Sequence, residues 1–215
     1  MDRAVIFDMD GVLLDSEPMH FDCARRLFAE DGLDYTHEIN SEFIGYTATH
    51  VMDVLIARYK LPRSSAQYME AYDRAIIERM RRHGEPSDGV GWLLDELARR
   101  GVAIGLASNS SASWVAATLG GLGLADRFGA AVAGDMVARG KPAPDVYLEA
   151  ARRLGVAPGR CVAIEDSGTG LTAALAAGMT ALALQTPHVE PARLAHAHRI
   201  LQSLREFPLE LLERA

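Results

Sequence analysis

The chain alternates short, continuous runs of apolar residues with longer stretches in which apolar positions recur at helical spacing. A short continuous run bounded by polar residues fits a strand that is buried in a sheet. Runs of this kind occupy residues 4–7, 102–107, 130–133, 161–164 and 181–184.

The stretches between the later runs predict helices, at residues 90–100, 113–119, 145–154 and 171–177. Strands that alternate with helices predict an α/β fold with a parallel sheet covered on both faces. Several of the stretches end at a glycine, as helix C-termini commonly do: Gly101, Gly120, Gly155 and Gly178.

The segment from residue 15 to residue 87 departs from this alternation because it contains no strand-like run. It shows three stretches with apolar residues at helical spacing, and Ser16 is expected to cap the first. We therefore expect an all-helical domain at residues 15–87, inserted into a core made of residues 1–14 and 88–215. Its apolar positions fit a small bundle core better than a cofactor site.

Composition and charge narrow the classes of function. The 215 residues are 49% hydrophobic, enough to bury a core, and the net charge of −7 argues against binding to nucleic acid. Cys23 and Cys161 lie outside any C-x-x-C pair, so we expect reduced core residues. Neither a signal-peptide pattern nor an apolar stretch of roughly 20 residues is found, which favours a cytoplasmic protein without a membrane span.

Polar residues follow the apolar runs at the ends of three predicted strands. Asp8 follows the first run, Ser108 the second, and Glu165 and Asp166 the fourth. The carboxyl ends of parallel strands form the edge of the sheet where ligands bind. We therefore expect these four residues, distant in sequence, to converge.

The converging carboxylates suit phosphoryl transfer, which requires a nucleophile, a cation and an acid or base. Asp8 and Asp10 are two residues apart, and Gly11 lets the backbone turn so that both can face one pocket. Mg²⁺ prefers such oxygen ligands. The candidates are Asp8, the backbone carbonyl of Asp10, and Asp166, with Glu165 as a further ligand.

Three other residues are candidates for binding a phosphate group. Ser108 and Asn109 offer a hydroxyl, an amide and backbone N–H groups at the expected start of a helix, where an anion is favoured. Lys141 adds a positive charge in the segment Lys141-Pro142-Ala143-Pro144, whose prolines restrict the backbone. Each residue alone is more typical of a cap or a solvated side chain, but the set together favours an active site.

Four ordered motifs resemble those of the haloacid dehalogenase superfamily, on its beta-phosphoglucomutase-like and sugar-phosphate phosphatase branch. The motifs are residues 8–17, Ser108-Asn109, Lys141-Pro142 and Glu165-Asp166-Ser167. The resemblance implies a Rossmann-like doubly wound sheet, a mobile helical cap and a Mg²⁺-dependent phosphatase of small phosphorylated metabolites.

The resemblance also implies roles for the individual residues. Asp8 would attack phosphorus to form an aspartyl-phosphate, and Asp10 would protonate the leaving oxygen and later activate water. Ser108 and Lys141 would hold the phosphoryl oxygens, and Asp166 would hold Mg²⁺, with Glu165 bound directly or through water.

Several alternatives remain open. A sugar-phosphate mutase is favoured by His20, which lies twelve residues after Asp8 as in the beta-phosphoglucomutase branch, and is disfavoured by Ala48, where that branch has an arginine. His20 is otherwise an exposed helix residue. The G-x-G-x-x-A match at residues 168–173 follows two acidic residues that would repel a pyrophosphate, which disfavours dinucleotide binding. A non-catalytic module has no need of an attacking carboxylate. The sequence does not identify the substrate. A monomer is expected.

Overall fold

The computed structural model describes residues 2–43 and 48–213. The chain divides into two compact units, one made of residues 1–15 and 84–215 and the other of residues 16–83. We call the first the core unit and the second the helical unit. Each is described by itself.

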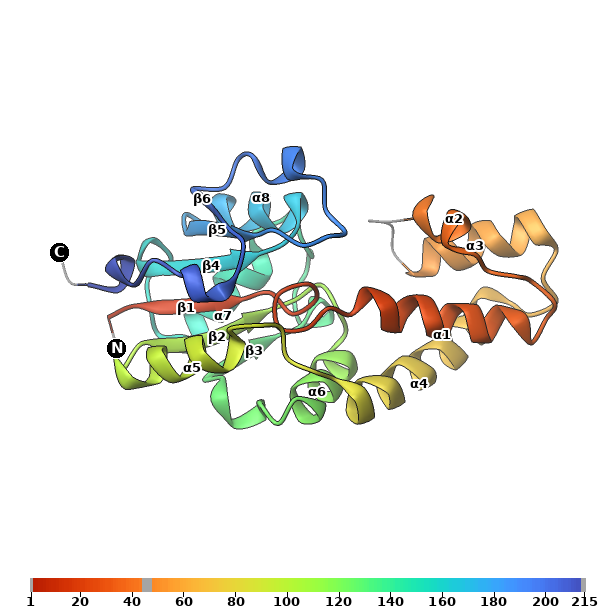
Figure 1. Cartoon of the computed structure of the whole chain (residues 1–215), viewed down its shortest axis with the longest axis horizontal. Helices are drawn as coiled ribbons and strands as arrows, with labels where there is room; N and C mark the ends of the chain where they lie inside the picture. The colour runs from red at the N-terminus through yellow and green to blue at the C-terminus, as the bar shows by residue number, and fades with distance from the viewer. Residues whose placement is uncertain (1, 44–47, 214–215) are drawn as a thin grey trace. The chain divides into compact units, whose positions relative to one another are not determined.

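The core unit contains a six-stranded sheet in the order β3-β2-β1-β4-β5-β6, and every neighbouring pair is parallel (Figure 1). The predicted α/β class with a Rossmann-like parallel sheet is confirmed. Each of the five predicted runs matches a strand to within one residue at its ends, and the sixth strand was not predicted. The strands are β1 Ala4–Phe7, β2 Ala103–Ala107, β3 Ala130–Val132, β4 Cys161–Glu165, β5 Thr180–Leu184 and β6 Arg199–Leu201.

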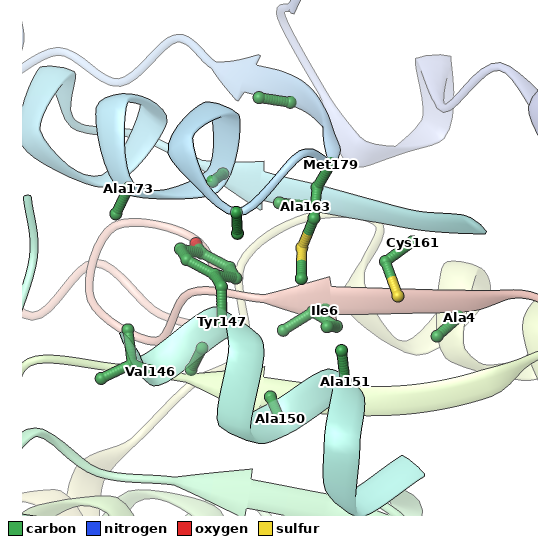
Figure 2. Close-up of a cluster of buried hydrophobic side chains, with 14 of the residues drawn as sticks. Ala4, Ile6, Val146, Tyr147, Ala150, Ala151, Cys161, Ala163, Ala173 and Met179 are labelled. Atoms are coloured by element: carbon green, nitrogen blue, oxygen red, sulfur yellow. The ribbon is translucent and has the colours of Figure 1, made fainter. Parts of the chain in front are cut away.

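Both faces of the sheet are covered. Side chains alternate along a strand, and in β1 both alternating sets are fully buried. Ala4 and Ile6 belong to a cluster with Tyr147 and Ala150 of α7 (Asp145–Leu154), as Figure 2 shows. Val5 and Phe7, which point the other way, are equally buried. Continuous apolar runs, rather than alternating ones, are the expected consequence.

The other helices of the core unit are α5 (Val90–Arg99), α6 (Ala112–Gly121) and α8 (Gly168–Ala176). The expectation that Gly120 ends a helix is wrong, because α6 runs through it. The left-handed residue that follows this helix is Gly123, with φ +66°. Short 3₁₀ turns complete the unit, at Ala125–Arg127, Gly134–Met136, Pro158–Arg160, Pro191–Leu194, Leu204–Glu206 and Leu209–Leu212.

The helical unit contains α1 (Glu17–Ala29), α2 (His37–Ser41), α3 (Ala48–Tyr59) and α4 (Ser65–His83). Its apolar stripes form a small bundle core, as expected, and the fully buried members are Phe28, Leu55, Tyr68, Ile76 and Met80.

The predicted cap of α1 by the Ser16 side chain is not found, whereas the prediction for the two cysteines is confirmed. Ser16 occupies the N-cap position of α1, but its side chain makes no capping hydrogen bond, and its backbone carbonyl accepts from Met19 and His20 instead. Cys23 and Cys161 are free and buried, as predicted. Among the described residues, no helix is both long and apolar enough to cross a membrane.

Candidate active site

The loop after β1 contains Asp8 and Gly11 and packs against the C-terminal end of β4. The Asp8 N–H donates to the carbonyl of Ile164 at 2.9 Å, and the carboxylate is almost fully buried. Gly11 has φ +76°, and its N–H donates to the carbonyl of Leu14. A Cβ at Gly11 would lie 1.9 Å from Asp166 Oδ2, so the close approach of these two loops requires glycine.

Lys141 reaches the nucleophile candidate from the loop before α7. Its Nζ donates to Asp8 Oδ1 at 2.6 Å, to the carbonyl of Ala107 at 2.9 Å and to Glu165 Oε1 at 2.5 Å. An ammonium group has three N–H donors, and all three are therefore engaged. The side chain is only 4% exposed. Lys141 is fixed at the end of β1 rather than solvated.

Glu165 is saturated by donors from the protein. Its Oε1 accepts from Lys141 Nζ and from the Tyr147 hydroxyl at 2.7 Å, and its Oε2 accepts from the Ser167 hydroxyl at 3.0 Å. The residue is fully buried. A buried carboxylate requires such donors because water cannot reach it. This carboxylate is therefore well placed to anchor the lysine.

Asn109 connects two loops through its side chain. Its Nδ2 donates to the carbonyl of Lys141 at 3.2 Å, and its Oδ1 accepts the Lys141 N–H at 2.7 Å. A Cβ at Gly140 would lie 2.7 Å from that Oδ1. Helix α6 begins at Ala112 after the N-cap Ser111. The expectation that Asn109 stands at the start of the helix is therefore wrong, and its amide holds the backbone of the lysine.

Ser108 and Ser110 lie between β2 and α6 and connect this loop to Asp10. Ser108 is 1% exposed, and its Oγ accepts the N–H of Ser110 at 3.0 Å, while its own O–H remains a donor. The Ser110 hydroxyl donates to Asp10 Oδ2 at 2.8 Å. The second aspartate of the pair is thus oriented by a serine one hundred residues away in sequence.

The electrostatics of the site are dominated by crowded carboxylates. Burial, and then repulsion from Glu165, raises the pKa of Asp8 well above its usual value, while Lys141 opposes the shift. Burial and the same neighbour raise the pKa of Asp166 to about 7. Burial alone would lower the pKa of Lys141, but attraction to Asp8 and Glu165 outweighs it and keeps the lysine cationic. Burial also raises the pKa of Tyr147, which remains a proton donor.

The donor set fits a divalent cation. Ligand oxygens of Asp8, Glu165 and Asp166 lie within 4.8 Å of one another. Carboxylate oxygens grouped in this way suit Mg²⁺, which takes few protein ligands. Burial and the mutual repulsion of the carboxylates raise the pKa values of Asp8 and Asp166, and a bound cation would lower both by stabilising the ionised forms.

The structure brings together the residues that the strand ends predicted to converge. It adds two that sequence reasoning missed, Ser110 and Tyr147. Tyr147 lies at an apolar helical position and Ser110 in a serine-rich turn, so neither carries a distinguishing signal. Hydrogen bonds join the core-unit candidates in two groups, Asp8, Asn109, Lys141 and Glu165 in one and Asp10 with Ser108 in the other, and Asp166 lies close to Asp8 and Glu165.

His20 belongs to the helical unit. Its Nδ1 is 2.7 Å from the Tyr72 hydroxyl, and the two rings stack. Ala48 is the first residue of α3. The stretch Gly45-Tyr46-Thr47, on which the comparison with the mutase branch partly depends, lies outside the described residues.

Comparisons with known proteins agree with this geometry. The family model described as haloacid dehalogenase-like hydrolase matches residues 5–184. A probable pseudouridine-5'-phosphatase of Drosophila melanogaster is 34% identical over 211 residues, which cover 95% of this chain and 91% of that protein. The fructose-1-phosphate phosphatase YqaB of Escherichia coli strain K12 is 34% identical over 178 residues, which cover 83% of this chain and 94% of the relative.

A solved structure is similar to this chain over its whole length. The D10N mutant of CbbY from Rhodobacter sphaeroides, in complex with xylulose-(1,5)bisphosphate, superposes with a TM-score of 0.86 at 28% identity, and each chain is covered completely. The region matched by the family model includes β2 to β5, all of β1 after Ala4, and the core-unit site residues described above. The chain belongs to the haloacid dehalogenase-like hydrolases.

Proposed function

We propose that the protein is a Mg²⁺-dependent phosphatase that hydrolyses a small phosphorylated metabolite, a sugar phosphate, through an aspartyl-phosphate on Asp8. The observation that carries the proposal is the fixed geometry of this carboxylate. Lys141 holds one of its oxygens, and among the described residues no hydrogen bond engages the other. A buried, oriented carboxylate with one oxygen available is suited to attack phosphorus.

The residues of the core unit supply a balanced two-step reaction. An oxygen of Asp8 attacks phosphorus, the bond to the ester oxygen breaks, and Asp10 gives its proton to the departing alcohol. Asp10 then takes a proton from a water molecule whose oxygen attacks the aspartyl-phosphate. Inorganic phosphate leaves, and Asp8 is restored. The hydrogen bond from Ser110 holds Asp10 for both proton transfers.

The phosphoryl oxygens require donors. The Ser108 hydroxyl and the Asn109 backbone N–H are the proposed ones, because the Asn109 amide is engaged with Lys141. Lys141 has no spare N–H, so it binds a phosphoryl oxygen only by exchanging one of its three present acceptors. Bound Mg²⁺, held by Asp8, Asp166 and the backbone carbonyl of Asp10, would supply positive charge to the phosphoryl group.

The substrate class rests on the relatives, whose names refer to phosphorylated sugars or to a phosphorylated nucleoside. We propose that the helical unit serves as the cap that selects among such substrates, that His20 is a helper on this cap, and that the protein acts as a cytoplasmic monomer. The core residues would perform the same chemistry on any of them.

A screen for phosphate release over sugar phosphates and nucleotides, with and without Mg²⁺, tests the proposal. Asp8→Asn serves as the control for contaminating phosphatases, because it removes the nucleophile. Release that requires both Mg²⁺ and Asp8 supports a phosphatase. An isomerised sugar phosphate without release would instead support the mutase alternative, and no turnover of any ester would refute both.

A further inference from the structure

The Tyr147 side chain lies next to the ammonium group of Lys141. It belongs to none of the motifs discussed above. It projects from α7 into the buried cluster shown in Figure 2 and is completely buried. Its hydroxyl donates to Glu165 Oε1 at 2.7 Å, and Lys141 Nζ lies 5.1 Å from the centre of its ring. The tyrosine therefore contacts both members of the buried ion pair.

The important detail is which oxygen of Glu165 accepts these hydrogen bonds. Lys141 and Tyr147 donate to the same oxygen of Glu165, and Lys141 also donates to Asp8 Oδ1. If the hydroxyl were absent, Lys141 would be the sole donor to that buried oxygen in the part of the chain that the structure describes. The ammonium would then be drawn toward Glu165 and away from Asp8, because an undersatisfied buried carboxylate is costly.

We propose that Tyr147 is a positioning residue, whose hydroxyl satisfies Glu165 so that Lys141 keeps its place on the nucleophile Asp8. The catalytic part of this inference rests on the proposed function. The hydroxyl of Tyr147 donates to Glu165 and its ring packs against Lys141, so the tyrosine acts on Asp8 through these two residues. The aromatic ring additionally packs against the ammonium, which a phenylalanine at this position would preserve.

The test compares Tyr147→Phe with a matched control, Tyr68→Phe. Tyr68 is also fully buried, and its hydroxyl donates to the carboxylate of Asp31 at 2.8 Å, but it lies in the helical unit. Both substitutions remove one tyrosine-to-carboxylate hydrogen bond, so a loss of thermal stability is expected from both. Only Tyr147→Phe is expected to lower kcat, by about 10- to 100-fold, with a smaller change in KM.

A second readout does not depend on activity. Lys60 and Lys141 are the only lysines in the sequence, and Lys60 is exposed whereas Lys141 is buried. With ¹⁵N-lysine, the buried ammonium should give a slowly exchanging resonance distinct from that of Lys60. We expect this resonance to shift or broaden in Tyr147→Phe and to stay unchanged in Tyr68→Phe.

The outcomes separate the two proposals. An unchanged ammonium resonance in Tyr147→Phe, or a kcat within twofold of the wild type, would overturn the positioning role. An equal loss of kcat in both variants would do the same, because it would indicate a general effect of stability. If the wild type hydrolyses no phosphate ester but the resonance still moves, the phosphatase proposal fails while the placement of Lys141 by Tyr147 stands.

Discussion

Gly11→Ala is expected to damage the proposed metal site without unfolding the protein. The residue has φ +76°, a conformation that costs an alanine about 1–2 kcal/mol. The added Cβ would lie 1.9 Å from Asp166 Oδ2, so this oxygen must retreat by about 1.5 Å to reach ordinary contact distance. A displacement of about 1 Å at an active site can lower the rate about 10²-fold. We expect a loss of that order in kcat/KM, with a higher Mg²⁺ requirement.

Gly101→Ala is the matched control. Gly101 also has a left-handed φ, +67°, but a Cβ there meets nothing within 4 Å. Urea unfolding in chelator should show a similar backbone penalty in both variants, while the Mg²⁺ titration of activity should change only in Gly11→Ala. Activity within a few-fold of the wild type in Gly11→Ala would refute the inference that this glycine admits Asp166 to the site. An equal loss of activity in Gly101→Ala would show that the effect is not specific to Gly11.

Four further predictions concern the carboxylates. Chelation should abolish turnover and Mg²⁺ should restore it, because the clustered carboxylates otherwise repel a phosphate dianion; undiminished turnover in excess chelator would contradict this. Asp8→Asn should remove essentially all turnover. Asp10→Asn should slow it by about 10²- to 10⁴-fold and let aspartyl-phosphate accumulate from an activated ester, as measured by intact-protein mass. Burial raises the pKa of Asp166 to about 7, against 3.8 for an unperturbed aspartate, so in chelator the folded protein binds this proton more tightly than the unfolded chain does. The Asp166 contribution to stability should therefore fall as pH rises through this window, as urea unfolding at about pH 5 and about pH 8 would detect; Asp166→Asn should flatten the slope.

The sequence predicts most of the sheet because buried parallel strands leave a strong signal. β1 and β4 are continuous apolar runs that end in acidic residues, and both were identified. β6 was missed because it is a short edge strand, Arg199–Leu201, in which only the last residue is buried. A strand of this kind is stabilised by its pairing with β5 rather than by its own pattern.

The site could be predicted only for residues whose type is unusual in its place. An aspartate directly after a buried strand, such as Asp8, stands out in the sequence, and so does Glu165 at the end of β4. Tyr147 does not, because an aromatic residue at a helical apolar position is typical of a core. The hydroxyl acquires its role only through its neighbour in space, as does the amide of Asn109, whose partner lies 32 residues away.

The active site contains more negatively charged groups than positively charged ones. Four carboxylates, from Asp8, Asp10, Glu165 and Asp166, share the site with the ammonium of Lys141, and each nearby carboxylate raises the pKa of Asp8. The lysine is already divided between Asp8 and Glu165, so it cannot also neutralise the other pair. In the proposed reaction, a divalent cation and a proton on Asp10 would each reduce the negative charge that an incoming phosphate dianion meets. The proton that Asp10 would give to the leaving group would then also lower the electrostatic cost of binding the substrate.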